Sequence, residues 1–141
     1  VGWVASNTEV ADILRDYRDY TMICAGVFDD MVATLVLENK EAILKRNRQI
    51  VEENLALMDA WIAKEPKASW IRPASVSTSF VKLDVNRPIE DFALELLQDY
   101  GVLVVPGNRF DKESHVRIGY CCDKEVLQKG LEKLSQFLNK C

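Results

Sequence analysis

The chain has 141 residues, of which 48% are hydrophobic and 28% are charged, and its formal net charge is −4. This composition is typical of a soluble globular protein and excludes a disordered or collagen-like chain. Basic residues are interleaved with acidic ones, so no basic stripe indicates a nucleic-acid partner. The most apolar stretch, residues 22–37, is interrupted by Asp29 and Asp30 and cannot be a membrane span. The length predicts one compact domain that needs neither a disulfide nor a metal.

The cysteines are Cys24, Cys121, Cys122 and Cys141. Cys121 and Cys122 are adjacent, which places their side chains on opposite faces of a predicted strand and favours neither a zinc pair nor a bridge. We therefore expect reduced thiols in a cytoplasmic protein. The chain starts at Val1 without a leader segment, which is also the pattern expected of a piece of a longer protein.

The first 38 residues predict two helices. Residues 1–5 are apolar and β-prone, and Ser6 and Glu9 have the spacing of a capping box, so we expect a helix to begin there. Apolar residues then recur at three- and four-residue intervals as far as Tyr20. A second helical pattern begins at Asp29. The apolar content of this region would suit packing against a surface that the chain does not contain.

The longest periodic run in the sequence follows Asn39. It predicts a long amphipathic helix that ends before Pro66, because a residue that precedes proline is pushed out of the α region. Charged residues such as Lys45 and Glu52 fall on its other face, which indicates a solvated surface. The apolar positions of the run are Ile43, Leu44, Ile50, Val51, Leu55, Met58, Trp61 and Ile62.

Four strands are predicted in the remainder of the chain. Residues 70–72 and 76–84 are rich in β-branched, serine and aromatic residues between turn signals. Residues 102–105 predict a short buried strand that Pro106 ends, and residues 115–120 alternate with period two.

Two helices lie among these strands. The first has Pro88 in its opening turn and stops at Gly101, which supplies a left-handed conformation. The second is capped by Asp123. Its apolar face is expected to consist of Val126, Leu127, Leu131, Leu134 and Leu138. The order of elements from residue 39 predicts an α+β fold, a small antiparallel or mixed sheet with helices packed on one face.

Arg117 is the residue of this fold that is best suited to bind a ligand. Period-two alternation places Val116 and Ile118 on one face of their strand and Arg117 on the other, away from the helices. A guanidinium on a rigid strand can bind a carboxylate through two parallel hydrogen bonds. The alternative is an ordinary solvated charge.

The loop from Val105 to Phe110 and the single histidine, His115, carry weaker signals. Pro106 and Gly107 allow a close backbone approach to a ligand, but a simple hairpin turn has the same pattern. His115 has no serine or cysteine that the sequence pairs with it, so a surface or hydrogen-bonded histidine is the simpler interpretation. No metal site is predicted.

The chain resembles the class I and II aminotransferases, a family of pyridoxal-phosphate enzymes in the aspartate-aminotransferase-like superfamily. The resemblance depends on the sequence Gly-Val-Leu-Val-Val-Pro-Gly from Gly101 to Gly107, then Phe110, then His-Val-Arg-Ile-Gly-Tyr from His115 to Tyr120. It extends to the strand at residues 80–83 and to residues 1–6.

The resemblance implies a fold and a role for several residues. Residues 39–141 would be the small carboxyl-terminal domain of the fold, and residues 1–38 a remnant of the large cofactor domain with its connection. Arg117 would bind the substrate α-carboxylate, and Pro106, Gly107 and Phe110 would line the substrate entrance. The parent enzyme would be a homodimer that moves an amino group between an amino acid and a 2-oxo acid.

No lysine of this chain lies in the context of the lysine that holds pyridoxal 5'-phosphate in the family. That residue, with the groups that bind the cofactor, would precede Val1, so the chain alone is expected to be inactive. Two alternatives remain. The chain could be the small domain of another pyridoxal-phosphate enzyme, such as a decarboxylase or carbon–sulfur lyase, or a non-catalytic α+β binding module.

Overall fold

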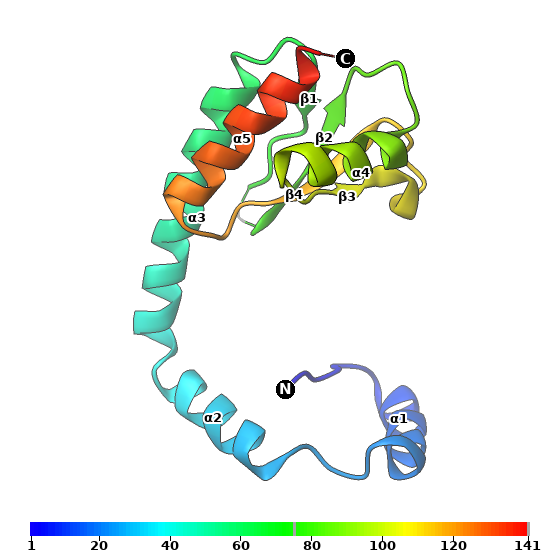
Figure 1. The fold of residues 1–141 in the computed structure, drawn as a ribbon. Coiled ribbons are helices and arrows are strands. Elements are labelled where there is room, and N and C mark those ends of the chain that lie inside the picture. The colour runs from blue at the N-terminus through cyan, green and yellow to red at the C-terminus, as the bar shows by residue number, and fades with distance from the viewer. Residues whose placement is uncertain (75, 141) are drawn as a thin grey trace. The chain divides into compact units, whose positions relative to one another are not determined.

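The computed structural model describes residues 1–74 and 76–140, which form two compact units. Unit 1 comprises residues 1–45 and unit 2 comprises residues 46–141. Each unit is a continuous stretch of the chain (Figure 1).

Unit 1 is helical. It contains α1 (Thr8–Thr21), α2 (Val27–Glu38) and the first residues of α3 (Lys40–Ile62). The predicted start at Ser6 is wrong: α1 is capped by Asn7, whose side-chain oxygen accepts a hydrogen bond of 3.0 Å from the Val10 amide. Asparagine is as good an N-cap residue as serine, and Asn7 directly precedes the first helical residue, Thr8. Residues 1–7 form no strand, because a strand needs a partner for its backbone hydrogen bonds.

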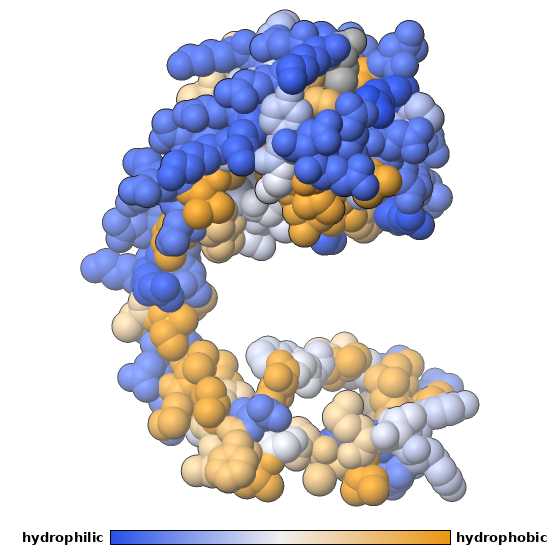
Figure 2. Space-filling view, viewed as in Figure 1, coloured by the Kyte–Doolittle hydropathy of each residue, from blue (hydrophilic) through white to orange (hydrophobic). Residues whose placement is uncertain are grey.

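No residue of unit 1 is buried. Apolar side chains lie at the surface along α2 (Figure 2), and the Phe28 side chain is 83% exposed. The Ile13 and Tyr17 side chains on the apolar face of α1 are also exposed. Among the described residues, no helix is long and apolar enough to cross a membrane.

The described part of unit 2 contains a four-stranded sheet in the order β1-β2-β4-β3, and every neighbouring pair is antiparallel. The strands are β1 (Ala68–Trp70), β2 (Thr78–Leu83), β3 (Val105–Pro106) and β4 (His115–Gly119). The first strand was predicted two residues too late. It begins at Ala68 because that buried side chain pairs with Leu83 and starts the register of the β1–β2 ladder.

The third strand also differs from its prediction. Val102 is not in the strand, because its amide bonds to the Leu96 carbonyl at the end of the preceding helix. Pro106, which was expected to end the strand, is part of β3 and pairs with Val116. A proline has no amide hydrogen, and it is tolerated here because β3 is the edge strand of the sheet.

Helices pack on one face of the sheet, as the sequence predicts (Figure 1). They are the second half of α3, α4 (Ile89–Tyr100), which ends at Gly101 with φ 65°, and α5 (Lys124–Leu138). One residue of the predicted α5 face is wrong. Val126 is 60% exposed, and Phe137 takes part in the core instead. The sheet contributes Val81, Leu83, Val116 and Ile118 to that core.

Candidate functional site

The face of the sheet that points away from the helices is called the open face here. Its residues on the two central strands are Thr78, Phe80, Lys82, His115, Arg117 and Gly119. The alternation predicted for β4 is confirmed, since Val116 and Ile118 are buried while Arg117 and Gly119 are exposed. The fold therefore presents the Arg117 side chain outward from the open face.

Arg117 stands on an interior strand. β4 lies between β2 and β3, and the cross-strand partners of Arg117 are Phe80 and Val105. Ladder hydrogen bonds on both sides restrict the backbone of an interior strand more than that of an edge strand. The Arg117 side chain thus extends from a firmly held part of the sheet.

An aromatic ring lies beside the Arg117 guanidinium. The guanidinium carbon lies 5.4 Å from the centre of the Phe110 ring, within the range of a cation–π contact. The Phe110 ring meets the Phe80 ring edge-on at 5.8 Å between centroids. The His115 ring stacks on the Phe80 ring at 4.8 Å between centroids. The open face therefore carries a cluster of aromatic rings next to the Arg117 guanidinium.

Arg117 makes no hydrogen bond or ion pair with any residue that the structure describes. Arg109, in the loop before β4, differs: its guanidinium pairs with Glu90 of α4, which also accepts a hydrogen bond of 2.8 Å from Asn108. The donors of Arg117 are therefore available to a ligand, whereas Arg109 has a partner within the fold.

Pro106 and Gly107 lie at the start of the 3-10 helix η1 (Gly107–Phe110), which brings Phe110 beside Arg117. Gly107 is buried. A Cβ atom there would lie 2.3 Å from the Lys112 carbonyl oxygen and 2.5 Å from that of His115. The close approach that glycine permits at this position is thus to the backbone of its own loop.

The sequence predicts a surface or hydrogen-bonded histidine at His115. It is half-buried, and its Nδ1 atom is buried without a hydrogen-bond partner among the described residues. Burial lowers its pKa below the usual value, and the positive charges of Lys112 and Lys82 lower the pKa further. The neutral ring is therefore favoured next to Phe80.

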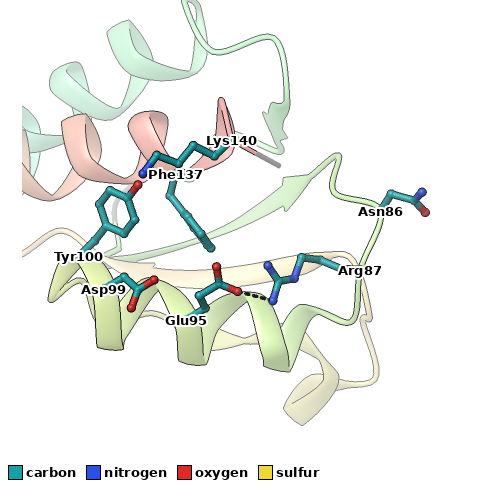
Figure 3. A pocket seen from close by; sticks show the side chains of 7 residues that line it. All are labelled: Asn86, Arg87, Glu95, Asp99, Tyr100, Phe137 and Lys140. Atoms are coloured by element: carbon teal, nitrogen blue, oxygen red, sulfur yellow. Dashed lines mark hydrogen bonds and ion pairs between the residues drawn. The ribbon is translucent and has the colours of Figure 1, made fainter.

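Two hollows lie elsewhere in unit 2. A pocket of about 220 Å³ lies beside α4 and α5 (Figure 3), but its Arg87 and Glu95 side chains pair with each other at 2.6 Å. The Lys140 ammonium lies over the Tyr100 ring there, 5.2 Å from the ring centre. An apolar groove runs between residues 101–104 and α5. Neither hollow is lined by Arg117 or Phe110.

Residues 1–134 match the family described as aminotransferase class I and II, and this match covers most of the chain. The chain belongs to the class I and II aminotransferase family. This membership confirms the family that the motifs of residues 101–107 and 115–120 indicate.

Two curated relatives illustrate the similarity. The chain is 27% identical to capreomycidine synthase of Streptomyces vinaceus, over 98% of this chain and 36% of that protein. It is 26% identical to the probable N-acetyl-LL-diaminopimelate aminotransferase of Bacillus subtilis (strain 168), over 99% of this chain and 36% of that protein. The chain therefore spans about a third of the length of these relatives.

Solved structures share the fold. A PLP-dependent aminotransferase from Streptococcus suis 89-1591 has a TM-score of 0.93 and 65% sequence identity, over 99% of this chain and 37% of that one. The PLP-dependent cyclase OrfR has a TM-score of 0.85 and 25% sequence identity, over 94% of this chain and 37% of that one. The α+β fold with a small antiparallel sheet is thus that of these enzymes.

The residues of the open face do not fit pyridoxal phosphate by themselves. The cofactor needs a lysine amine to form a Schiff base and groups that hold its ring and phosphate. Among the described residues that point to this face, Lys82 is the lysine, and it is exposed on β2 opposite His115. No carboxylate side chain is among them. The face fits a carboxylate ligand instead.

Sequence reasoning did not identify two residues that bear on the site. The sequence places Phe80 in a strand, and period-two alternation puts its side chain on the opposite face of the sheet from that of Val81. Its ring contacts depend on the β2–β4 register, which the sequence pattern does not give. Asn54 lies on α3 and is 2% exposed. Its position among the apolar residues of a predicted helix is the sequence feature that could have identified it as a buried polar residue.

Proposed function

We propose that the chain is the carboxyl-terminal part of a pyridoxal-phosphate-dependent aminotransferase and that Arg117 binds the α-carboxylate of its amino-acid substrate. The observation that carries the proposal is the Arg117 guanidinium, which stands on an interior strand and has no hydrogen-bond or ion-pair partner among the described residues. Two charge-assisted hydrogen bonds to a carboxylate would satisfy this fork. The family membership of the chain supports this choice of ligand.

The surroundings of Arg117 would also orient the substrate. A carboxylate bound by the guanidinium would have the Phe110 ring at its side, since that ring lies 5.4 Å from the guanidinium carbon. We assign Phe110, with Pro106 and Gly107 that position it, to the substrate entrance. Apolar rings beside a bound carboxylate would displace water from it, which would strengthen the electrostatic attraction between the two charged groups.

The remaining parts of the proposal concern the whole enzyme. Residues 1–38 belong to the large cofactor domain and its connection, and residues 39–141 form the small domain. The enzyme transfers an amino group between an amino acid and a 2-oxo acid in the cytoplasm, as a homodimer. The exposed apolar side chains of α2 support this proposal, since such side chains are usually covered by another protein surface. Because no lysine of this chain matches the cofactor lysine, the chain alone is inactive.

A second candidate is a synthase or cyclase reaction of the same cofactor. Its support is the 27% identity to capreomycidine synthase and the fold shared with the cyclase OrfR. Arg117 would then still bind a carboxylate, but the amino group would not pass to a 2-oxo acid. Assay of the holoenzyme with a panel of amino acids and 2-oxoglutarate separates the two, because a transaminase alone returns glutamate and the matching oxo acid.

The role of Arg117 is tested by Arg117→Leu in the holoenzyme. The loss of two hydrogen bonds to a charged group is expected to lower kcat/KM for the amino acid by about 10² or more. The matched control is Arg109→Leu, which removes a guanidinium that already pairs with Glu90 and is expected to change kcat/KM by less than about threefold.

Equal effects of the two substitutions would refute the role of Arg117. The 141-residue chain mixed with pyridoxal phosphate supplies a further control. A visible absorption band that borohydride traps on a lysine of this chain would show that the chain holds the cofactor by itself and would overturn its proposed inactivity.

A further inference from the structure

The carboxyl-terminal end of β4 is held by a side chain from the helix layer. The Nδ2 atom of Asn54 donates hydrogen bonds of 2.7 Å to the carbonyl oxygens of Tyr120 and Cys122. Asn54 is among the buried polar residues of unit 2, at 2% exposure. Burial of an amide is costly unless its hydrogen-bonding groups are paired. The Asn54 amide group therefore pairs its donors while it satisfies both carbonyls.

The regular pairing of β4 ends just before this point. β4 ends at Gly119, which pairs with Thr78 at the start of β2. A Cβ atom at position 119 would meet no other atom, so packing does not require a glycine there. A glycine at a strand end leaves the backbone free to bend. External hydrogen bonds must then fix the course of the chain after Gly119.

Those bonds come from two directions. The Tyr120 amide donates to the Ser77 carbonyl at 3.0 Å, and the Tyr120 hydroxyl donates to the Val76 carbonyl. They hold Tyr120 to the segment before β2. Asn54 holds the same residue, and Cys122 beyond it, to α3. Among the described residues, no other hydrogen bond joins these two carbonyls to the helix layer.

We infer that Asn54 is a positioning residue for Arg117: through the Tyr120 and Cys122 carbonyls it fixes the end of the strand that presents the guanidinium to the substrate carboxylate. This inference rests on the proposed function of Arg117. Arg117 lies on β4, three residues before Tyr120, which directly follows the strand. A misplacement of about 1 Å in a group that orients substrate can reduce activity about 10²-fold.

The test is a double-mutant cycle in the holoenzyme with Asn54→Ala and Arg117→Lys. Asn54→Ala is expected to raise KM for the amino acid about tenfold and to change kcat by less than about twofold, because carboxylate binding is weakened in the ground state and transition state alike. In the Arg117→Lys enzyme, Asn54→Ala should change KM by less than about twofold, since coupled residues are not additive.

Trp61→Phe is the matched control. The Trp61 indole also belongs to α3 and donates a hydrogen bond of 2.8 Å, but to Ser135 of α5 and not to β4. Both single variants are expected to lower Tm by a few degrees. Trp61→Phe should leave KM within about twofold. A similar loss of Tm with a different effect on KM would support positioning over general stability.

Each outcome bears on the inference. If Asn54→Ala and Trp61→Phe raise KM equally, or if the effect of Asn54→Ala adds in full to that of Arg117→Lys, the positioning role is overturned while the Arg117 proposal stands. If Arg117→Lys leaves kcat/KM within about twofold, the proposed function fails and the inference fails with it. Should Asn54→Ala not fold, Asn54→Ser retains one donor and must show the same non-additivity.

Discussion

α1 in unit 1 and α5 in unit 2 have the same kind of sequence pattern and different surroundings. Apolar residues recur at helical spacing in both. In α5, Leu127, Leu131 and Leu134 are buried against the sheet, whereas no residue of α1 is buried. The difference teaches that periodicity predicts a helix and its apolar face, but burial depends on a partner surface, which the sheet supplies only in unit 2.

The comparison predicts unequal costs for the same substitution, and this is the largest expected effect. Leu96→Ala removes a fully buried side chain of α4 and is expected to lower the free energy of unfolding by about 2–5 kcal/mol. Leu35→Ala on α2, where the side chain is 57% exposed, is expected to change it by less than about 0.5 kcal/mol. Urea unfolding followed by circular dichroism measures both. Equal costs would break the comparison.

Glycine substitutions sharpen the contrast with a smaller effect. Gly107→Ala places a Cβ against two backbone carbonyls that cannot move without the loop, and should cost about 1–3 kcal/mol. In unit 1, a Cβ at Gly26 would lie 2.6 Å from the Asp29 carboxylate, the mobile end of a side chain. Gly26→Ala should therefore cost much less. The prediction fails if thermal unfolding shows Gly26→Ala to be the more destabilising variant.

The smallest effect concerns pH and again distinguishes the units, because His115 is the single histidine and lies in unit 2. Its pKa is lowered in the folded chain, whereas the unfolded chain has a value of about 6.5. The unfolded state thus binds the proton more readily, so stability is fully present above about pH 6.5 and is lost as pH falls through the folded pKa.

His115→Gln should reduce this loss, as unfolding at about pH 7.5 and 5.5 would measure. Titration of the single imidazole by NMR reads the folded pKa directly. A value at or above that of an unfolded peptide, or the same loss of stability in both proteins, would contradict the assignment.

Local signals in the sequence predicted the elements of unit 2 well. The stop at Gly101 has the left-handed φ that glycine supplies, and the alternation from His115 to Tyr120 gives the correct faces of β4. The errors occur where hydrogen bonds outside the local pattern decide. Val102 bonds to the end of α4 instead of entering β3, and Asn7 caps α1 in place of Ser6.

The candidate site was predicted in part for the same reason. Arg117 could be placed on the open face from period two alone. The ring contacts of Phe80 with Phe110 and His115 depend on strand register and on the course of η1. The Asn54 bonds join residues of α3 and the end of β4 that are far apart in the sequence. No local pattern contains such long-range partners.

The strand order has a consequence for when the site forms. β2 and β4 are the central pair of the sheet, yet α4, β3 and η1 lie between them in the chain. Closing so long a loop costs entropy before the pairing is gained, and non-local pairing of this kind slows folding. Because Arg117 faces Phe80 only across that pair, we expect the guanidinium to reach its place after β2 and β4 have paired, so that carboxylate binding would report an assembled central pair.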